Sequence, residues 1–311
     1  IHNSLLSRRT FDYCIIDEAS QILQPVALGP WFVAKVCVLV GDHKQLPPLV
    51  RSRDAKDGGM TESLFKRLCT AHGSAVVDLT LQYRMNQWIM AIPNALVYSG
   101  HLKCGTAAVA NSTLRVPRWP EMVSRTPPFH ETSLKPWMLH ALDPDNSVVF
   151  LNTDHVASAA QTGSNRTVHN ALEVHLLVQI VTLMQEAGVP HESIGVLCPF
   201  NVQIQHLQNA FPKGRAVDVL TIDKSQGRDK ECILLSLVHN NGEAHIGEIM
   251  RDLSRLNVAF TRAKHKLLVI GSMATYRPNA PWTELLDLLE SRRWVHNLPS
   301  DANLHTVDHL L

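Results

Sequence analysis

Short apolar runs that alternate with helical segments are the feature that most constrains the fold of this chain. The runs that we predict as strands cover residues 13–16, 36–40, 76–81, 147–153, 194–198, 217–222, 231–238 and 266–270. Continuous apolar runs of this length are typical of strands buried on both faces of a parallel sheet. Strands that alternate with helices indicate parallel sheets covered by helices. The predicted fold class is therefore α/β, with two such domains.

The segments between these runs carry helix signals. Residues 61–71 form an amphipathic pattern. Asn170, followed three residues later by Glu173, is a variant of the capping box and predicts the start of an apolar helix. Gly188 and Pro190 are expected to end that helix. One face of a further predicted helix carries the apolar side chains Phe200, Ile204, Leu207 and Phe211.

Residues 106–147 separate the two blocks of strands and helices. They carry six of the seventeen prolines of the chain. Proline removes a hydrogen-bond donor and fixes φ, so we expect an irregular connection here. The predicted division is a first domain over 1–105, a proline-rich connection over 106–146, a second domain over 147–296 and a tail over 297–311.

Composition limits the sites and partners that this segment can have. A net charge of +1 across 311 residues gives no overall basic field, so a nucleic-acid site has to be a local groove. The six cysteines form no C-x-x-C pair, which favours a reducing compartment, nucleus or cytosol, and argues against a zinc or iron–sulfur site. No apolar run approaches the roughly 18 residues that span a bilayer, so no membrane partner is predicted.

Polar residues follow the first two predicted strands at the point where each strand ends. Asp17 and Glu18 come directly after residues 13–16, and Gln45 follows the next strand in "VGDHKQLPP". Ligands of open α/β sheets bind at the carboxyl ends of strands, so the pattern predicts a cation site there. A glutamine beside such a site can contact a phosphate or orient a water molecule. Taken alone, an acidic pair after a strand is equally typical of a cap or a solvated turn.

Two further stretches present arginines. "LQYRMN" places Tyr83 and Arg84 near another predicted strand end, and "RLNVAFTRAKH" supplies Arg255 and Arg262. Residues seven apart on a helix lie on nearly the same face, which is the arrangement that we expect for the latter two. A single arginine is more typical of a surface ion pair.

Taken together, "IIDEASQ", "GDHKQLPP", "LQYRMN", "TIDKSQGRDKE" and "LNVAFTRAK" resemble, in order and spacing, the motifs of superfamily 1 helicases of the Upf-like group. The resemblance covers residues 11–275 except the connection at 106–147. The residues within these motifs are similar to those of the helicase/nucleases of eukaryotic DNA replication. This resemblance implies two RecA-like domains, the first incomplete at its N-terminus. It also implies an ATP-driven motor that uses Mg²⁺ and moves 5′ to 3′ on DNA.

The resemblance also implies roles in ATP hydrolysis. Asp17 would hold the hydration shell of Mg²⁺, Glu18 would position and deprotonate the attacking water, and Gln45 would contact the γ-phosphate. Arg84 and Arg262 resemble arginine fingers, which neutralise transition-state charge and contribute roughly 10³–10⁵ in rate. Further nucleotide contacts are implied for Tyr83, Gln226, Gly227 and Asp229. Many relatives have glutamate in place of Asp229, so a ribose or phosphate contact at that residue stays open.

Nucleic-acid contacts are implied for the stretch after the strand "IGVLC" and for one further strand end. The residues are Pro199, Phe200, Asn201 and Thr221. The ring of Phe200 can stack on a base, worth about 1–3 kcal/mol, or belong to the core, and the sequence favours neither. Motor motifs contact mainly the nucleic-acid backbone, which differs little between DNA and RNA, so an RNA or RNA–DNA helicase stays an alternative. A non-catalytic nucleic-acid-binding scaffold is the second alternative.

The resemblance requires a phosphate-binding loop, G-x-x-x-x-G-K-[ST], that the 311 residues do not contain. Thr106 and Glu248 stand where the lysine is needed in the two candidate glycine spacings. We therefore expect the chain to be the C-terminal part of a longer protein with an upstream single-strand nuclease domain and iron–sulfur cluster. The family further implies single-stranded and flap DNA as substrates, in flap processing and end resection. It implies replication protein A as a partner, and the nucleus, with the mitochondrion as a second location.

Overall fold

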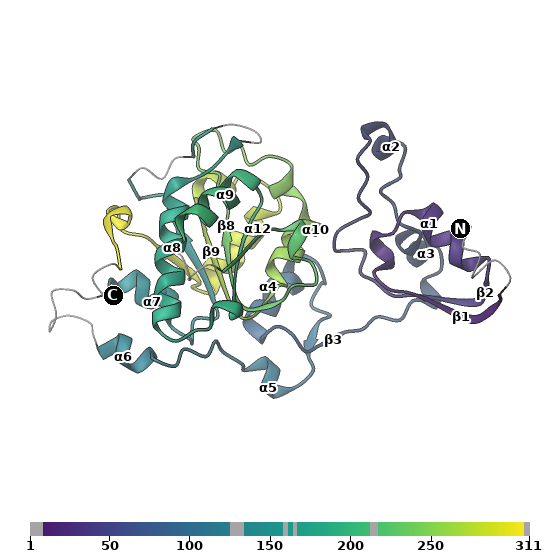
Figure 1. Ribbon diagram of the computed structural model, residues 1–311, viewed down its shortest axis with the longest axis horizontal. Helices are drawn as coiled ribbons and strands as arrows, with labels where there is room; N and C mark the ends of the chain where they lie inside the picture. Colours follow the sequence, from purple (N-terminus) through teal and green to yellow (C-terminus); the bar gives the residue numbers. More distant parts are fainter. Residues whose placement is uncertain (1–8, 125–133, 158–160, 164–166, 212–216, 308–311) are drawn as a thin grey trace. The chain divides into compact units, whose positions relative to one another are not determined.

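The computed structural model describes residues 9–124, 134–157, 161–163, 167–211 and 217–307 of the chain. The chain divides into two compact units, residues 1–79 and residues 80–311. Figure 1 shows the first unit in purple and dark blue and the second in colours from blue to yellow. The helices of the described residues include none that is both long and apolar enough to cross a bilayer.

The first unit is built on two parallel strands. Its elements are β1 (Phe11–Ile16), α1 (Gln24–Trp31), β2 (Ala34–Leu39), α2 (Arg53–Asp57) and α3 (Leu64–Ala71). The predicted helix over 61–71 begins later, because the hydroxyl of Ser63 accepts the backbone N–H of Lys66 and caps α3 at that point. A long connection that includes α2 leads from β2 to α3.

The sheet of the first unit is not buried on both faces as its sequence predicts. In the parallel register Tyr13 lies opposite Val36 and Ile15 opposite Val38, so the four side chains share one face. Tyr13 and Ile15 are 69% and 70% exposed, and no described segment covers them. The apolar run identified the strand correctly, but the expectation of full burial is wrong for the described residues. Burial depends on what packs against the strand, which lies outside the local pattern.

The second unit contains the larger sheet. Its elements up to the second predicted block are β3 (Leu81–Gln82), α4 (Gln87–Leu96), β4 (Lys103–Cys104), α5 (Ala107–Ala110), α6 (Trp119–Ser124) and α7 (Pro136–Leu142). They are followed by β5 (Val148–Asn152), α8 (Ala171–Glu186), β6 (Ile194–Cys198), α9 (Asn201–Ala210), β7 (Asp218–Thr221), β8 (Lys230–Ser236), α10 (Leu253–Phe260), β9 (Ala263–Gly271), α11 (Met273–Tyr276), α12 (Trp282–Ser291) and β10 (Val295–Asn297).

Six of these strands form one sheet in the order β10-β5-β9-β8-β6-β7, and every neighbouring pair is parallel. In β8, Cys232 and Leu234 face the core shared with α7, α8 and α9, whereas Ile233 and Leu235 point to the opposite side. On that side α4 packs against β9, and α10 and α12 pack against α4 (Figure 1). All four side chains are buried, so helices cover both faces. The predicted α/β class with a helix-covered parallel sheet is confirmed.

The proline-rich connection is more regular than we expected. It contains the short helices α5, α6 and α7, and Trp137 and Leu142 of α7 are buried in the core of the second unit. Pro136 starts α7 at a position where its missing N–H has no partner to lose. The expectation of irregular structure is therefore wrong for these three helices. Residues 125–133 of the connection lie outside the described residues.

Residues 80–105, which the sequence assigns to the first domain, pack with the second unit. Asn86 caps α4 by accepting the N–H of Ile89, and its side-chain amide donates to the carbonyls of Ser112 and His265 and to the hydroxyl of Ser147. This buried asparagine therefore joins α4 to β9 and to the start of β5. The predicted domain limits stay predictions, but the compact units of the chain divide after residue 79.

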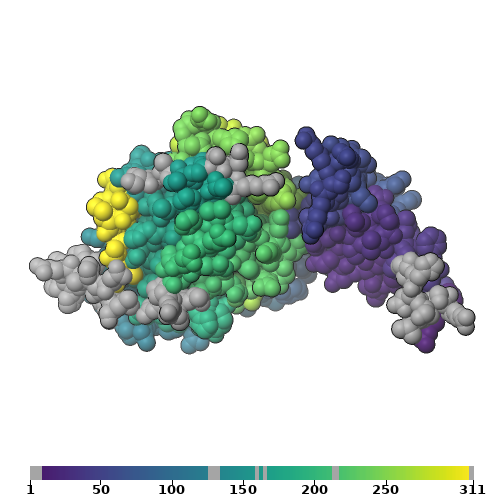
Figure 2. All heavy atoms as spheres, turned by 45° about the horizontal axis from the view of Figure 1, so that its top comes forward, coloured from purple at the N-terminus to yellow at the C-terminus, as the bar shows by residue number. Residues whose placement is uncertain are grey.

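The described part of the tail packs on α7 and α8. The indole N–H of Trp137 donates to Nδ1 of His305 over 2.9 Å, and the backbone N–H of Val307 donates to Gln179 over 2.7 Å. Figure 2 shows these yellow residues against the teal surface of the second unit. The tail therefore contributes to the core. Residues 308–311 lie outside the described residues.

Candidate functional site

The acidic pair of the first unit lies at the carboxyl end of β1. Glu18 has a φ of 50°, in the left-handed region, and its N–H donates to the Asp17 carboxylate over 2.9 Å. The Glu18 carboxylate accepts the Gln21 side-chain amide over 2.7 Å. Both carboxylates are exposed. The chain therefore turns directly after the strand and presents two acidic groups to solvent at its carboxyl end. The predicted cation site at this point stays a prediction.

The end of β2 lies beside this pair. The N–H of Ala19 donates to the carbonyl of Val40, and a Cβ on Gly41 would lie only 3.0 Å from the backbone nitrogen of Ser20. A side chain at residue 41 would therefore push the two strand ends apart. The Gln45 amide donates to the Asp42 carboxylate over 3.0 Å, which fixes it near this edge.

These residues suit a magnesium ion that keeps most of its water. Among the described residues no group of three or more His, Cys, Asp or Glu side chains is placed to hold a metal. Mg²⁺ usually binds through one or two carboxylates together with water and substrate phosphates, and it needs no protein cage. Asp17 fits that role, and among the described residues Glu18 forms no ion pair that would compete with a metal ion.

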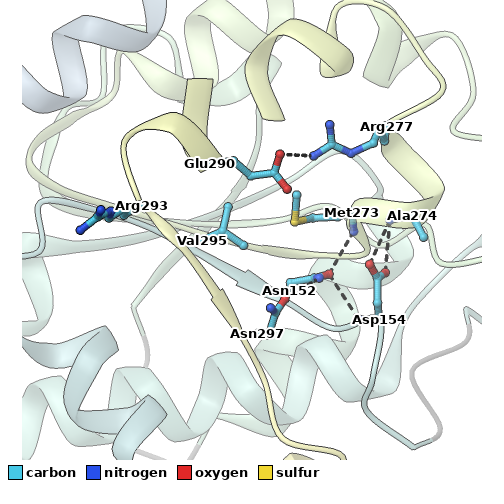
Figure 3. Close-up of a pocket in the computed structure, with 9 residues that line it drawn as sticks. All are labelled: Asn152, Asp154, Met273, Ala274, Arg277, Glu290, Arg293, Val295 and Asn297. Carbon is cyan, nitrogen blue, oxygen red and sulfur yellow. Dashed lines mark hydrogen bonds and ion pairs between the residues drawn. The ribbon is translucent and has the colours of Figure 1, made fainter. Parts of the chain in front are cut away.

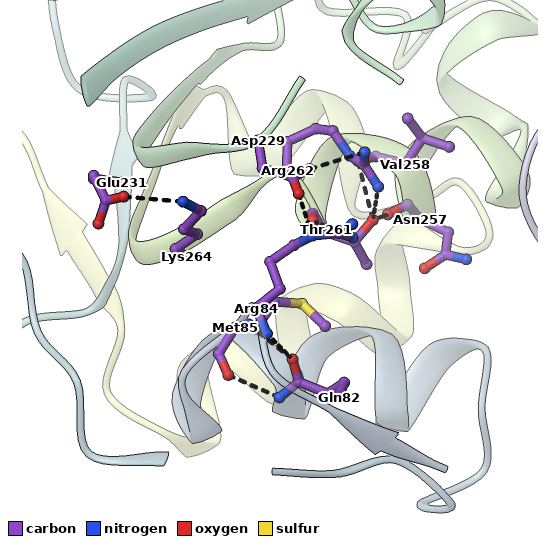
Figure 4. Close-up of polar contacts among 10 residues, drawn as sticks. All are labelled: Gln82, Arg84, Met85, Asp229, Glu231, Asn257, Val258, Thr261, Arg262 and Lys264. Carbon is purple, nitrogen blue, oxygen red and sulfur yellow. Dashed lines mark hydrogen bonds and ion pairs between the residues drawn. The ribbon is translucent and has the colours of Figure 1, made fainter. Parts of the chain in front are cut away.

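Both predicted arginine fingers converge on one carboxylate in the second unit (Figure 4). Arg84 Nε lies 2.5 Å from Asp229 Oδ2, and the Arg262 guanidinium lies 3.0 Å from Asp229 Oδ1. Arg84 also donates to the Thr261 carbonyl over 3.4 Å. Residues far apart in the sequence thus form one cluster, which we call the arginine cluster: Arg84, Asp229 and Arg262.

The two arginines differ in their surroundings. The Arg262 side chain is 3% exposed, and it donates to the Val258 carbonyl and the Thr261 hydroxyl, each over 3.1 Å. The Arg84 side chain is 37% exposed. Arg262 is therefore held rigidly from the end of α10, while Arg84 reaches toward it from the loop after β3. Planar guanidinium groups so placed can each donate two hydrogen bonds to phosphate oxygens.

Arg262 does not lie on a helix face with Arg255. The helix α10 ends at Phe260, and Arg262 stands between its C-cap and the start of β9. Arg255 pairs instead with Asp223 over 3.0 Å and Asp252 over 2.6 Å. The shared-face prediction is wrong because the apolar pattern "LNVAF" continues into a strand without a marked stop signal.

The remaining predicted nucleotide contacts are close to the arginine cluster in sequence or in space. Both polar atoms of the Gln226 side-chain amide are buried and have no hydrogen-bond partner among the described residues. Buried amides are normally satisfied, so an unpaired one is suited to receive a ligand. Gly227 adopts a φ of +73°, which a glycine tolerates best. The exposed ring of Tyr83 lies against Gly105, where a Cβ would collide with it.

The predicted nucleic-acid residues gather at the carboxyl ends of two neighbouring strands. Cys198 of β6 lies opposite Thr221 of β7, so Pro199 and Phe200 emerge beside that threonine. Phe200 is half-buried and stands outside the hydrophobic core cluster, and Asn201 is exposed. This placement favours the stacking role of the ring over the core role, since one part of the ring stays accessible.

The two groups of residues lie at opposite edges of the same parallel sheet. Asp229 and Arg262 directly precede β8 and β9, whereas Phe200 follows β6 and Thr221 ends β7. The predicted nucleic-acid residues therefore lie at carboxyl strand ends and Arg84 follows β3, whereas Asp229 and Arg262 lie at amino strand ends; the binding roles of these residues stay predictions. The long turn between β7 and β8 brings Asp229 back to the amino edge of the sheet.

One pocket of the second unit was not predicted from the sequence (Figure 3). It has a volume of about 500 Å³ and lies where β5 and β10 end. Asn152 donates to Asn297 across the two strands over 2.9 Å, and Arg277 pairs with Glu290 over 2.7 Å. No motif marks these residues. Their charges are already paired or mixed in sign, so the pocket indicates no class of ligand.

Comparison with known proteins places the chain in a family. A family model described as an AAA domain matches residues 60–274, and a second model with the same description matches residues 1–53. The chain belongs to the AAA domain family.

Individual relatives agree with the resemblance that the motifs predict. The chain is 44% identical to the protein named DNA replication ATP-dependent helicase/nuclease DNA2 of Mus musculus, over 100% of the chain and 29% of that protein. It is 42% identical to the proteins of the same name from Homo sapiens, over 96% of the chain and 28% of the relative, and Saccharomyces cerevisiae, over 96% and 20%. The chain thus spans less than a third of these relatives, and the predicted resemblance is confirmed.

Proposed function

We propose that this chain is part of an ATP-dependent helicase motor that acts on DNA during replication. The proposal is supported by its similarity to proteins named as DNA replication helicase/nucleases, over nearly its whole length. Proteins of that name are much longer than this chain, so the activity belongs to the complete polypeptide.

The arginine cluster is the observation that carries the proposal. Two guanidinium groups that converge within 3.0 Å of one carboxylate form a site for concentrated negative charge, such as a phosphoryl group in transfer. Hydrolysis of ATP with Mg²⁺ supplies the free energy for movement. Arg84 and Arg262 neutralise the developing charge, and Asp229 orients both until they are engaged. The unpaired Gln226 amide contributes a further contact.

The acidic pair of the first unit serves the same reaction. Asp17 holds the hydration shell of Mg²⁺, and Glu18 positions the attacking water and accepts its proton. Gln45, fixed by Asp42, contacts the γ-phosphate. The exposure of both carboxylates at a strand end supports these roles.

The carboxyl edge of the large sheet binds the nucleic acid. Pro199, Phe200, Asn201 and Thr221 contact the strand, and the ring of Phe200 stacks on a base. The proposal includes 5′-to-3′ movement, single-stranded and flap DNA as substrates, and roles in end resection and repair. It also includes replication protein A as a partner, nuclear and mitochondrial location, and a nuclease domain with an iron–sulfur cluster elsewhere in the polypeptide. These finer points rest on the family resemblance alone.

The test is steady-state ATPase of the full natural polypeptide at saturating single-stranded DNA. Arg262→Ala is expected to lower kcat by at least about a hundredfold, with a smaller change in nucleotide affinity. Arg262→Lys should not restore the rate, because an ammonium group cannot span two phosphate oxygens as a planar guanidinium does.

Arg255→Ala is the matched control, since its ion pairs with Asp223 and Asp252 lie outside the arginine cluster. It is expected to have a smaller effect. An Arg262→Ala variant that hydrolyses ATP like the wild type would exclude the finger role and favour a non-catalytic binding scaffold. Equal stimulation by RNA and DNA would favour the RNA helicase alternative.

A further inference from the structure

The chain makes a strained turn directly after β8. Val238 has a φ of +72°, a left-handed conformation that a β-branched residue rarely adopts. The N–H of His239 donates to the carbonyl of Leu237 over 2.8 Å and closes a three-residue turn around Val238. Turns of this hand are rare and strained, and they persist only where surrounding groups hold them.

Three buried side chains hold this turn, two from the N-terminal end of α8 and one from α11. The Glu173 carboxylate accepts the Val238 N–H over 2.9 Å. The Asn170 amide donates to the Val238 carbonyl over 3.1 Å, and the Tyr276 hydroxyl donates to the Leu237 carbonyl over 2.5 Å. The turn is therefore fixed from α8 and α11 at both of its peptide groups.

Glu173 serves this turn and not the helix that carries it. The sequence predicts a capping box, in which Glu173 would accept the N–H of Asn170. That N–H donates instead to Gln203 over 2.9 Å, and only the cap from Asn170 to the Glu173 N–H, at 3.1 Å, is formed. The reciprocal half of the capping box is therefore wrong. The Ser236 hydroxyl donates to Glu173 over 2.5 Å, so the carboxylate is committed to the end of β8.

The burial of Glu173 is costly and needs a reason. One carboxylate oxygen has no hydrogen-bond partner, and none of the described residues forms an ion pair with Glu173. Burial raises the pKa of Glu173 to about 7, with the hydrogen bonds from Ser236 and Val238 opposing the shift. A leucine would fill such a site at lower cost, so the hydrogen bond to the strained peptide is what the carboxyl group adds.

The turn sets the position of the His239 ring. This ring is 4% exposed, its Nδ1 lies 2.8 Å from the Gln161 side-chain oxygen, and it meets the Phe200 ring edge-on with centroids 5.1 Å apart. The same buried network continues to α9, because the Gln203 amide donates to Ser236 over 3.1 Å. Both sides of the His239–Phe200 contact are thus tied to Glu173.

We propose that Glu173 is a positioning residue for nucleic-acid binding. With Tyr276, it holds the strained turn at Val238, and the turn fixes His239 against Phe200 so that the Phe200 ring is oriented to stack on a base. The inference rests on the proposed function, since it requires that Phe200 contacts single-stranded nucleic acid.

The experiment uses the full natural polypeptide and single-stranded oligonucleotides that carry 2-aminopurine, whose fluorescence is quenched on stacking. Glu173→Met keeps the length of the side chain and removes the acceptor, and it is expected to weaken binding roughly tenfold and to reduce the quenching, as for loss of one stacked base. Glu173→Gln retains an acceptor for Val238 and should bind like the wild type.

Rescue by glycine separates positioning from general loss of structure. Glycine adopts a positive φ without steric cost, so adding Val238→Gly to Glu173→Met should restore most of the affinity and quenching. Tyr276→Phe removes only the hydroxyl that anchors Leu237, and it provides the same test with the same rescue if Glu173→Met fails to fold.

Phe200→Ala distinguishes a failure of the proposed function from a failure of the positioning role of Glu173. If Phe200→Ala binds the labelled strand like the wild type, the nucleic-acid role of this edge in the proposed function is wrong. If Phe200→Ala weakens binding while Glu173→Met and Tyr276→Phe do not, the positioning role is overturned and the proposed function stands. Weak binding by Glu173→Met that Val238→Gly fails to restore would likewise overturn it.

Discussion

The buried carboxyl group of Glu173 should leave a signature in the pH dependence of stability. Its pKa is raised from 4.5 to about 7 in the folded protein, chiefly by burial. The folded state therefore binds more protons than the unfolded state between these two values. The stabilisation is fully present below about pH 4.5 and is lost as pH rises through about 7. Glu173→Gln removes this group and keeps the shape of the side chain.

The magnitude follows from the shift. A shift of about 2.5 pKa units corresponds to about 3 kcal/mol, of which about 2 kcal/mol falls between pH 5 and 7.5. His239 has the opposite effect, because burial lowers its pKa to about 4. The unfolded state therefore binds more protons at this residue, and its contribution to the free energy of unfolding rises with pH up to about 6.5. Wild type and Glu173→Gln both contain His239, so its effect cancels in the difference between their free energies of unfolding. We expect the wild type to lose about 2 kcal/mol more than the variant across this range.

Urea unfolding at pH 5, 6, 6.5, 7 and 7.5 measures this difference. The fluorescence of Trp137 and Trp282, both buried in the second unit, reports the transition, and linear extrapolation gives the free energy of unfolding at each pH. Glu284→Gln, which changes an exposed glutamate of α12, is the matched control and should run parallel to the wild type. Parallel curves for the wild type and Glu173→Gln would refute the burial argument for Glu173.

Three further changes test other parts of the structure. Asp229→Ala removes the ion-pair partner of the buried Arg262 and should lower the free energy of unfolding by about 2 kcal/mol, less than for a fully buried pair because Asp229 is 24% exposed; an unchanged urea midpoint would contradict it. Glu18→Gln in the full natural polypeptide should leave ATP binding near normal and nearly abolish hydrolysis, whereas a rate within a few-fold of wild type would remove Glu18 as the base. Gly271→Ala places a Cβ about 2.6 Å from the Leu237 side chain and should cost about 1–3 kcal/mol in the same unfolding assay; an unchanged free energy of unfolding would contradict it.

The strands β5 to β9 of the second unit could be predicted from sequence because each is a compact apolar run between turn signals, whereas the short strands β4 and β10 carry no such run and were not predicted. The predicted 194–198 coincides with β6, and the other strands of that block differ by one to three residues at their ends. The predicted strand at 76–81 is wrong except at its last residue, Leu81, which begins the two-residue strand β3. Cross-strand hydrogen bonds decide such a boundary, and they depend on the partner β4.

The candidate site was predictable as far as its residue types and their order along the chain. The convergence of Arg84 and Arg262 on Asp229 was not, because the sequence gives no distance between residues that stand so far apart. The role of Glu173 was hidden for a related reason. Its spacing from Asn170 matches the capping box, but in the structure its carboxylate accepts the Val238 N–H, a contact that the local sequence does not show.

A single strand joins the arginine cluster to the strained turn. Asp229 directly precedes β8, and Val238 follows it by two residues, so the strand spans the distance between the two sites at about 3.3 Å per residue. The strand pairs with β6 on one side and β9 on the other, and residues 232–236 are buried. A strand paired on both sides can neither bend nor slide along its axis without breaking hydrogen bonds to both neighbours. The strand is therefore a rigid spacer, and it fixes the distance between the arginine cluster at its amino end and the Val238 turn just past its carboxyl end.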